Sequence, residues 1–238
     1  SHQEMIKAHI IKSAVVKDAG VDSEIVTCIL TYPRFIHAEF MTHRTFSRNA
    51  ASSRAIPIKR MIREVIKNPA TPLYWGRNKK GMQASEEHQG FMRWLAVSTW
   101  LWFRWFAVAG AWALDKLQVH KQIANRLLEP WSHITVIMTT GHAGLMNFFK
   151  LRAHPDAQPE FQVLAYFILE AYLDPVRTVD VLAPGEYYVP MLTTTEWMEL
   201  KRDGKIDEAI KIACGRIARV SYLTHDGKSS PVDDIALN

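Results

Sequence analysis

Apolar residues along the chain fall into two patterns, short β-branched runs and longer stretches with helical spacing. The runs at 25–32 and 134–140 predict strands, and the first ends at Pro33, as expected where a strand leaves a sheet. Elsewhere the apolar residues recur every three to four positions, which is typical of amphipathic helices. Helices are predicted at 35–46, 58–66, 91–114, 119–128, 145–151, 158–173 and, for most of its length, 195–222.

Proline and glycine mark the connections between these elements. Pro57 precedes the 58–66 helix, and proline is tolerated in the first turn because its dihedral already suits a helix start. The segments 68–81 and 180–192 are rich in proline and glycine, which predicts loops. No repeat, coiled coil or low-complexity segment is visible. The pattern therefore predicts one mixed α/β domain over 1–238.

The 91–114 helix is unusually rich in tryptophan. Arg93 and Arg104 interrupt it, and the uninterrupted apolar runs are too short to cross a bilayer. A helix that is apolar all round in a water-soluble protein is expected to be buried. We therefore predict that other helices cover it, including helices of other subunits, and keep tryptophan-rich docking on a membrane surface as the lesser alternative.

Composition narrows the function classes. The chain is 48% hydrophobic, enough to build a core, and its formal charge of +5 is modest. Duplex-binding proteins usually carry a denser basic band, so we expect phosphate-binding sites for small molecules and no nucleic-acid partner. Cys28 and Cys214 form no disulfide framework and no zinc spacing, which predicts packing roles, no metal and a reducing cytoplasm as the location.

The segment 42–54 concentrates groups that bind anions. It carries three arginines, Arg44, Arg48 and Arg54, together with several hydroxyl side chains. Arginine presents a planar fork of donors that stays charged, and serine can donate to the remaining phosphate oxygens or to a base edge. No acidic residue lies between Glu39 and Glu64, whereas an ordinary solvated helix face mixes both signs. The segment therefore predicts a site for an anionic ligand, with a basic helix face as the alternative.

The same segment resembles the signature of the flavin-dependent (ThyX-type) thymidylate synthases, which is R-H-R-x-x-S-x-N-x-x-S-x-R followed by Tyr. Six positions fall in register: His43, Arg44, Ser47, Asn49, Ser52 and Arg54. A second region resembles the family's later motifs through Arg126 and Pro130, Asn147 to Arg152, and Ala157 to Gln162. The departures are Thr42, Ala50 and Ala55 in the signature and Glu39 in place of an upstream Gln.

The resemblance implies a role for each matching residue. Arg152 would contact the uracil ring of dUMP and Ser52 would lie near the base, so both are the candidate catalytic residues. The other residues expected at dUMP are Glu39 and Ser53, with Arg54 and Arg126 at the phosphate. The residues expected at FAD are His43, Arg44, Arg48, Asn49 and Asn147. Ordinary alternatives exist: Arg126 could cap a helix, Asn147 could close a turn, and Arg152 could pair with Asp156 or Glu160.

The fold and reaction follow from the resemblance as expectations. The fold would be a central, mostly antiparallel sheet flanked by helices, without a Rossmann unit, in a homotetramer with shared active sites. The reaction would methylate dUMP reductively, with 5,10-methylenetetrahydrofolate as the carbon donor and NADPH-reduced FAD as the hydride source. The alternatives are a flavin- and folate-dependent hydroxymethylase acting on dUMP or dCMP, and a noncatalytic nucleotide- or RNA-binding homologue.

One departure concerns order along the chain. Family members often begin with A-R-V-S-[FY], followed by an S/T-P-x-E-H stretch. Here the first of these lies at 218–222, and no such His follows before Asn238. We therefore expect a rearranged branch of the family, with a chain truncated after 238.

Overall fold

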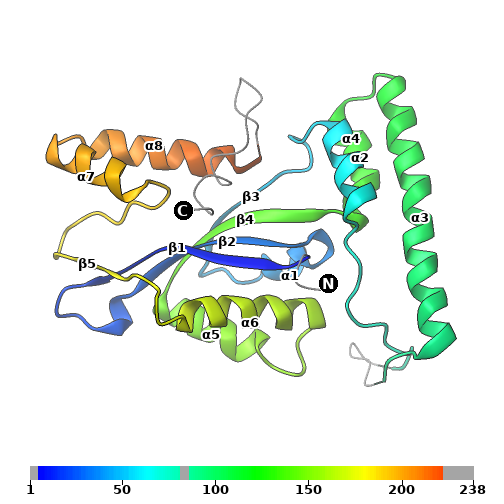
Figure 1. The fold of residues 1–238 in the computed structure, drawn as a ribbon, viewed down its shortest axis with the longest axis horizontal. Coiled ribbons are helices and arrows are strands. Elements are labelled where there is room, and N and C mark those ends of the chain that lie inside the picture. The colour runs from blue at the N-terminus through cyan, green and yellow to red at the C-terminus, as the bar shows by residue number, and fades with distance from the viewer. Residues whose placement is uncertain (1–4, 81–85, 222–238) are drawn as a thin grey trace.

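The structure is a computed structural model that describes residues 5–80 and 86–221 of the chain. Its centre is one five-stranded sheet in the order β3-β4-β2-β1-β5 (Figure 1). Neighbouring strands are antiparallel except β5, which pairs parallel to β1. The strands are β1 (Lys7–Val16), β2 (Ile25–Pro33), β3 (Ser47–Ala50), β4 (His133–Gly141) and β5 (Asp180–Leu182).

Helices cover both faces and one end of this sheet (Figure 1). One face carries α5 (His142–Arg152) and α6 (Pro159–Leu173), and the opposite face carries α7 (Thr194–Arg202) and α8 (Ile206–Ala218). The end of the sheet carries α2 (Ile58–Lys67), α3 (Gly90–Lys116) and α4 (Lys121–Ala124). The shorter elements are η2 (Val21–Ser23), η3 (Arg34–Ile36), α1 (His37–Phe40), η4 (Asn125–Trp131) and η5 (Arg219–Ser221). This arrangement confirms the expected mostly antiparallel sheet flanked by helices.

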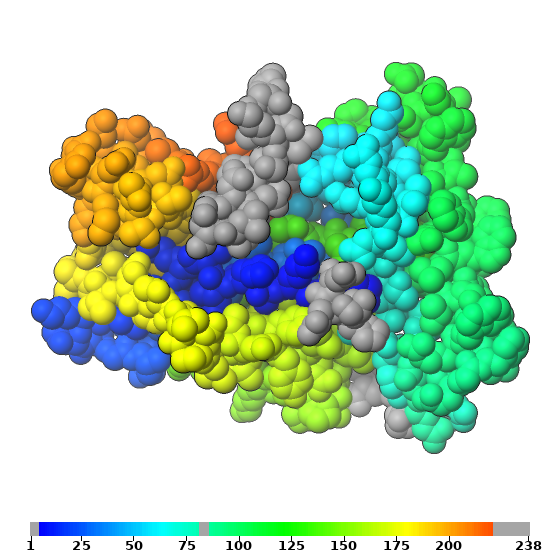
Figure 2. All heavy atoms as spheres, viewed as in Figure 1, coloured from blue at the N-terminus to red at the C-terminus, as the bar shows by residue number. Residues whose placement is uncertain are grey.

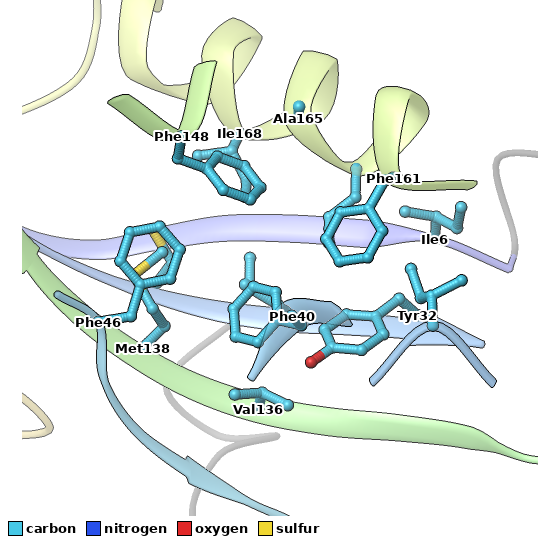
Figure 3. Close-up of a cluster of buried hydrophobic side chains, with 14 of the residues drawn as sticks. Ile6, Tyr32, Phe40, Phe46, Val136, Met138, Phe148, Phe161, Ala165 and Ile168 are labelled. Carbon is cyan, nitrogen blue, oxygen red and sulfur yellow. The ribbon is translucent and has the colours of Figure 1, made fainter. Parts of the chain in front are cut away.

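Alternation along the central strands divides the core into two layers. Side chains at every second position of β2, from Val26 to Tyr32, are buried in the main cluster between the sheet and α5 and α6. Ile29 belongs to a smaller cluster with Met191 and Val220 on the other face. Phenylalanine rings from α1, α5, α6 and the segment before β3 meet in the main cluster (Figure 3). These rings form the floor on which the candidate site is built.

The predicted strands at 25–32 and 134–140 are confirmed, because these segments form β2 and β4, which pair with each other in the sheet. The strand β1 was not predicted, and β5 lies inside the predicted 180–192 loop. The β1 sequence mixes polar and apolar residues, and its pairing register shifts between Ile10 and Lys12, which hides the period of two. The predicted 119–128 helix is split into α4 and the 3-10 helix η4.

The predicted helix at 35–46 is wrong beyond Phe40. The chain turns there, since the Thr42 hydroxyl donates to the Glu39 carbonyl, and residues 47–50 then form β3. A local hydroxyl-to-carbonyl bond of this kind competes with helix continuation. The basic segment is therefore a loop and a strand, and the alternative of a basic helix face is excluded.

The tryptophan-rich segment forms a helix, as predicted, but it is not buried within the chain. Ala111 is the one buried residue of α3, and Trp94 and Trp102 are 60% and 61% exposed. Within the described residues, one side of α3 packs, against α2, α4 and η4. No helix in the described part of the chain is long and apolar enough to cross a membrane.

The two cysteines differ from each other. Cys28 is buried in β2 as predicted, and burial raises the pKa of its thiol to about 12. Cys214 is exposed on α8, so the prediction that it packs in the core is wrong. The expected truncation after 238 concerns a segment outside the described residues.

Candidate functional site

The loop between α1 and β3 presents the first half of the candidate site, and Arg48 holds it in shape. Its guanidinium donates to the carbonyls of His43 and Phe46 at 3.1 and 2.8 Å. It also donates to the carbonyl of Met41 at 3.0 Å. These bonds fix the turn that carries His43 and Arg44, so Arg48 uses several of its donors within its own loop.

His43 meets Arg152 across the fold, 109 positions later in the chain. Arg152 Nε donates to His43 Nε2 at 2.9 Å, which places the proton of the neutral imidazole on Nδ1. Burial and the charges of Arg152 and Arg48 lower the pKa of His43 to about 4. The imidazole is therefore neutral at pH 7 and acts as an acceptor for the arginine.

Aromatic rings fix the orientation of this pair. The Arg152 guanidinium lies over the Phe161 ring at 4.6 Å, and the His43 ring meets Phe148 edge-on at 4.9 Å. Phe148 and Phe161 belong to the aromatic floor in Figure 3. With Nε used by His43, the two terminal nitrogens of Arg152 have no hydrogen-bond partner within residues 5–80 and 86–221. A half-buried guanidinium held in this way can donate to the carbonyl oxygens of a ligand.

The loop after β3 presents the second half of the candidate site. The buried Asn125 side chain donates to the carbonyls of Ser53 and Ile56 at 2.7 and 2.8 Å. Ser53 Oγ donates to Glu129 at 2.5 Å, and Arg126 pairs with the same carboxylate at 3.1 Å. Glu129 thus joins the Ser53 loop to Arg126, which pairs with Glu129 within η4 and caps no helix among the described residues.

Positive charge surrounds this second half. Arg54 is exposed, with no partner among the described side chains. A hollow of about 380 Å³ beside the loop is lined by Ala51 and Ile56 and by the cations Arg60, Arg63 and Lys67 of α2. One of these, Arg60, is paired with Glu64. The net positive charge favours an anionic group here.

The strand β3 separates the two halves. Its pairing with β4 runs from Ser47 opposite Thr139 to Ala50 opposite Val136, and the Ala51 amide then donates to the Thr135 carbonyl. Four strand steps at about 3.3 Å each place Ser47 and Ala51 about 13 Å apart. The His43–Arg152 pair and the Arg54–Arg126 group therefore lie at opposite ends of β3.

The remaining expected site residues differ in their surroundings. Asn49 donates its amide to the Ile217 carbonyl at 2.6 Å, so it ties β3 to α8. Asn147 and Arg44 are exposed and make no side-chain hydrogen bond within the described ranges. Ser52 is half-buried. One carboxylate oxygen of Glu39 is buried without a hydrogen-bond partner among the described atoms, so it can accept from a ligand.

The sequence alone gave no role to Asn125 or Glu129. Both act on neighbours far along the chain, since Asn125 holds the Ser53 loop and Glu129 joins that loop to Arg126. The only available signal was their position within four residues of Arg126. Arg34 is a third example, because it donates to Ser132 and to the Ala51 carbonyl, fixing the start of the second half.

Comparison with known proteins identifies the family and the fold of the chain. The family model described as thymidylate synthase complementing protein matches residues 23–174, which include both halves of the site. Two solved structures of the UMP/dUMP methylase PolB from Streptomyces cacaoi, bound with 5-Br dUMP and 5-Br UMP, are similar in fold. Each matches 75% of this chain with a TM-score of 0.56. The 5-Br dUMP complex is 17% identical in sequence, with 92% of its chain covered, and the 5-Br UMP complex is 18% identical, with 91% covered. No curated protein matches the chain. The family match covers more than half of the sequence, and the chain therefore belongs to the thymidylate synthase complementing protein family.

Proposed function

We propose that this protein is a flavin-dependent thymidylate synthase that converts dUMP to dTMP. 5,10-Methylenetetrahydrofolate would donate the carbon and NADPH would be the reductant. The observation that carries the proposal is the hydrogen bond between Arg152 and His43, because it joins the two family-like motifs at one place in the fold. The family match and the nucleotide named for PolB support the same substrate class.

On the substrate side, Arg152 would donate to the uracil carbonyls with its two terminal nitrogens. Donors fixed in advance can stabilise negative charge that develops on the ring as its carbons react. Arg54 and Arg126 would hold the phosphate, with Ser52 and Ser53 placed by the same loop. Glu39 would accept from the base or the sugar through its buried carboxylate oxygen.

On the flavin side, the donor set suits a large anionic cofactor. Arg44 and Asn147 are exposed donors, and Gly144, one turn before Asn147 in α5, lies against Thr45 in the loop that carries Arg44. Bound FAD would supply the hydride chemistry that no side chain provides. Arg48 and Asn49 are already bonded within the chain, so we propose that they position the loop and β3.

The separation along β3 supports a shared site. Arg152 and the Arg54–Arg126 group are expected to hold the base and the phosphate of one nucleotide, yet they lie at opposite ends of β3. A second copy that supplies one of the two groups would complete the site, as in the homotetramer that the resemblance implies. A cytoplasmic enzyme with a small-molecule nucleotide substrate is the overall proposal.

The test is the mass of the nucleotide after anaerobic incubation of the protein with FAD, NADPH, 5,10-methylenetetrahydrofolate and dUMP. Thymidylate is the expected product, and a reaction without NADPH is the control. A hydroxymethyl product would replace the proposal with the hydroxymethylase alternative. Unchanged dUMP in a protein that retains flavin would reject this substrate, and a protein that binds no flavin would favour the noncatalytic homologue.

A further inference from the structure

The outer face of α3 is a large apolar surface that no described part of the chain covers. Nine large apolar side chains on this helix are between 44% and 70% exposed. The helix forms one edge of the molecule (Figure 1), and atoms of this segment make up the surface there (Figure 2). Monomeric proteins rarely expose a contiguous apolar patch of more than a few hundred Å², and a larger one marks an interaction surface.

Seven of the exposed positions of α3 have the spacing of a coiled-coil seam. Positions 92, 95, 99, 102, 106, 109 and 113 are separated alternately by three and four residues, and all seven are exposed. Six of the seven are apolar, and Thr99 is the exception. The inner face uses other positions, such as Trp100, Ala107 and Ala111, to pack on α2 and η4. A period of three and a half residues on an outer face is the pattern by which one helix pairs with another.

We propose that α3 pairs antiparallel with α3 of a second copy of this chain. The seam is bulky toward its N-terminal end, at Met92 and Leu95, and small toward its C-terminal end, at Ala109 and Ala113. Antiparallel pairing places bulky side chains opposite small ones, so that both ends of the seam fill evenly. Parallel pairing would set alanine against alanine and leave space between the helices.

The seam also defines the register of the pair. When Met92 faces Ala113 of the second copy, Thr99 faces Phe106 and the two-fold axis passes between Trp102 and Phe103. Such an interface is isologous, because each copy uses the same surface. The result is a closed dimer that covers both apolar faces.

The chemistry of this surface fits a second copy better than a lipid surface. None of the seven seam positions is charged, and large apolar side chains such as Phe103 and Trp105 lie beside the seam, where an interfacial helix would carry a row of Lys or Arg. α3 carries three cations, and each has a partner: Arg93 is paired with Glu87, and Lys116 lies over the Trp112 ring. Arg104 lies over the Trp105 ring and donates to the Ile66 carbonyl. The helix has 27 residues, about 40 Å in length, which is long enough for a standard interface of about 800 Å² per partner.

The first test measures the mass of the purified full chain in solution, without ligands. We expect Trp102→Glu with Phe106→Glu to halve the mass of the assembly, because two carboxylates then face the seam of the other copy. Val176→Glu, at a residue that is 82% exposed elsewhere, is the control and should leave the mass unchanged. Both variants should keep the wild-type circular dichroism spectrum. A monomeric wild-type protein, or an unchanged mass in the seam variant, would overturn the proposal.

The second test uses cysteine crosslinking to determine the direction of the helices, in a Cys214→Ser background. Phe103→Cys should crosslink to itself, since it lies beside the axis. Met92→Cys should not crosslink to itself, but it should crosslink to Ala113→Cys when the two variants are mixed. Efficient self-crosslinking of Met92→Cys would show a parallel pair and reject the register. A monomer that floats with anionic vesicles would assign the face to lipid. Neither test depends on the proposed reaction, so an inactive protein could still pair in this way.

Discussion

At the scale of single residues, Arg152 is held on two sides. Its Nε donates to His43 and its plane lies over the Phe161 ring, so the terminal nitrogens are the donors left for a ligand. His43 is neutral because burial and two nearby arginines lower its pKa to about 4. A charged imidazole at this place would repel the arginine that it now accepts from.

Replacing Arg152 by lysine tests the donor geometry. Lysine keeps the charge but loses the planar fork and the Nε donor. It therefore cannot donate to His43 and to two carbonyl oxygens of a ligand at the same time. We expect kcat/KM for dUMP to fall by about 10²- to 10³-fold, as when one preorganised donor is removed. Lys150→Ala, an exposed change in the same helix, is the control. Equal kinetics for Arg152→Lys and wild type would show that the guanidinium does not touch the substrate.

The lowered pKa of His43 predicts that the free energy of unfolding depends on pH. Its pKa lies below the ordinary value of 6.5 in the folded protein, so the unfolded chain binds a proton more readily. The stabilising contribution is complete above about pH 6.5 and is lost as the pH falls toward 4. Urea unfolding at several pH values should show this, and His43→Gln should reduce the loss. Part of the loss of stability at low pH will remain in this variant, because burial also lowers the pKa of His133 to about 4.

At the scale of elements, the position of the loop before β3 depends on α5. A Cβ on Gly144 would lie 3.0 Å from Thr45 Oγ1 and closer still to Thr140 Oγ1. The missing side chain therefore lets the first turn of α5 approach the loop that carries His43 and Arg44. The local sequence does not reveal this close contact, because a glycine within a helical pattern indicates only a lower helix propensity.

Gly144→Ala should destabilise the protein by about 1–3 kcal/mol, because the added methyl group overpacks the contact with Thr45 and Thr140. Gly215→Ala in α8 is the matched control, since a Cβ there meets nothing within 4 Å. That change should stabilise by about 0.5–1 kcal/mol through helix propensity. Thermal melting of both variants measures the difference. A stabilised Gly144→Ala protein would mean that α5 and the loop are not in close contact.

At the scale of the whole molecule, the two halves of the candidate site lie at opposite ends of β3. If two copies share each site, Arg54→Ala and Arg152→Ala damage different halves. Each variant alone should be nearly inactive, and coexpression of the two should restore about a quarter of the wild-type activity for random pairing of two chains per site. Thymidylate formation by the purified mixture is the measurement. Activity no higher than that of the single variants would indicate that one chain supplies both arginines.

The strands that sequence reasoning found, β2 and β4, are the most buried strands of the sheet. β2 and β4 are covered on both faces, so they appear in the sequence as continuous apolar runs that need no context. β5 is an edge strand of three residues, and β1 is only partly buried, so polar side chains and the irregularity after Ile10 mask the alternation in β1. The loop after Phe40 was missed because its shape depends on bonds from Arg48, eight residues further along.

The sequence by itself determined most of the helices, the two most buried strands and the family, because periodicity and ordered motifs are local properties of the chain. Only the tertiary structure placed Arg152 against His43, joined Arg126 to the Ser53 loop through Glu129, and gave Arg48 and Asn49 their partners within the chain. It also decided that α3 presents an apolar face outward. These are contacts between distant segments, and they depend on how the sheet brings its two ends and its flanking helices together.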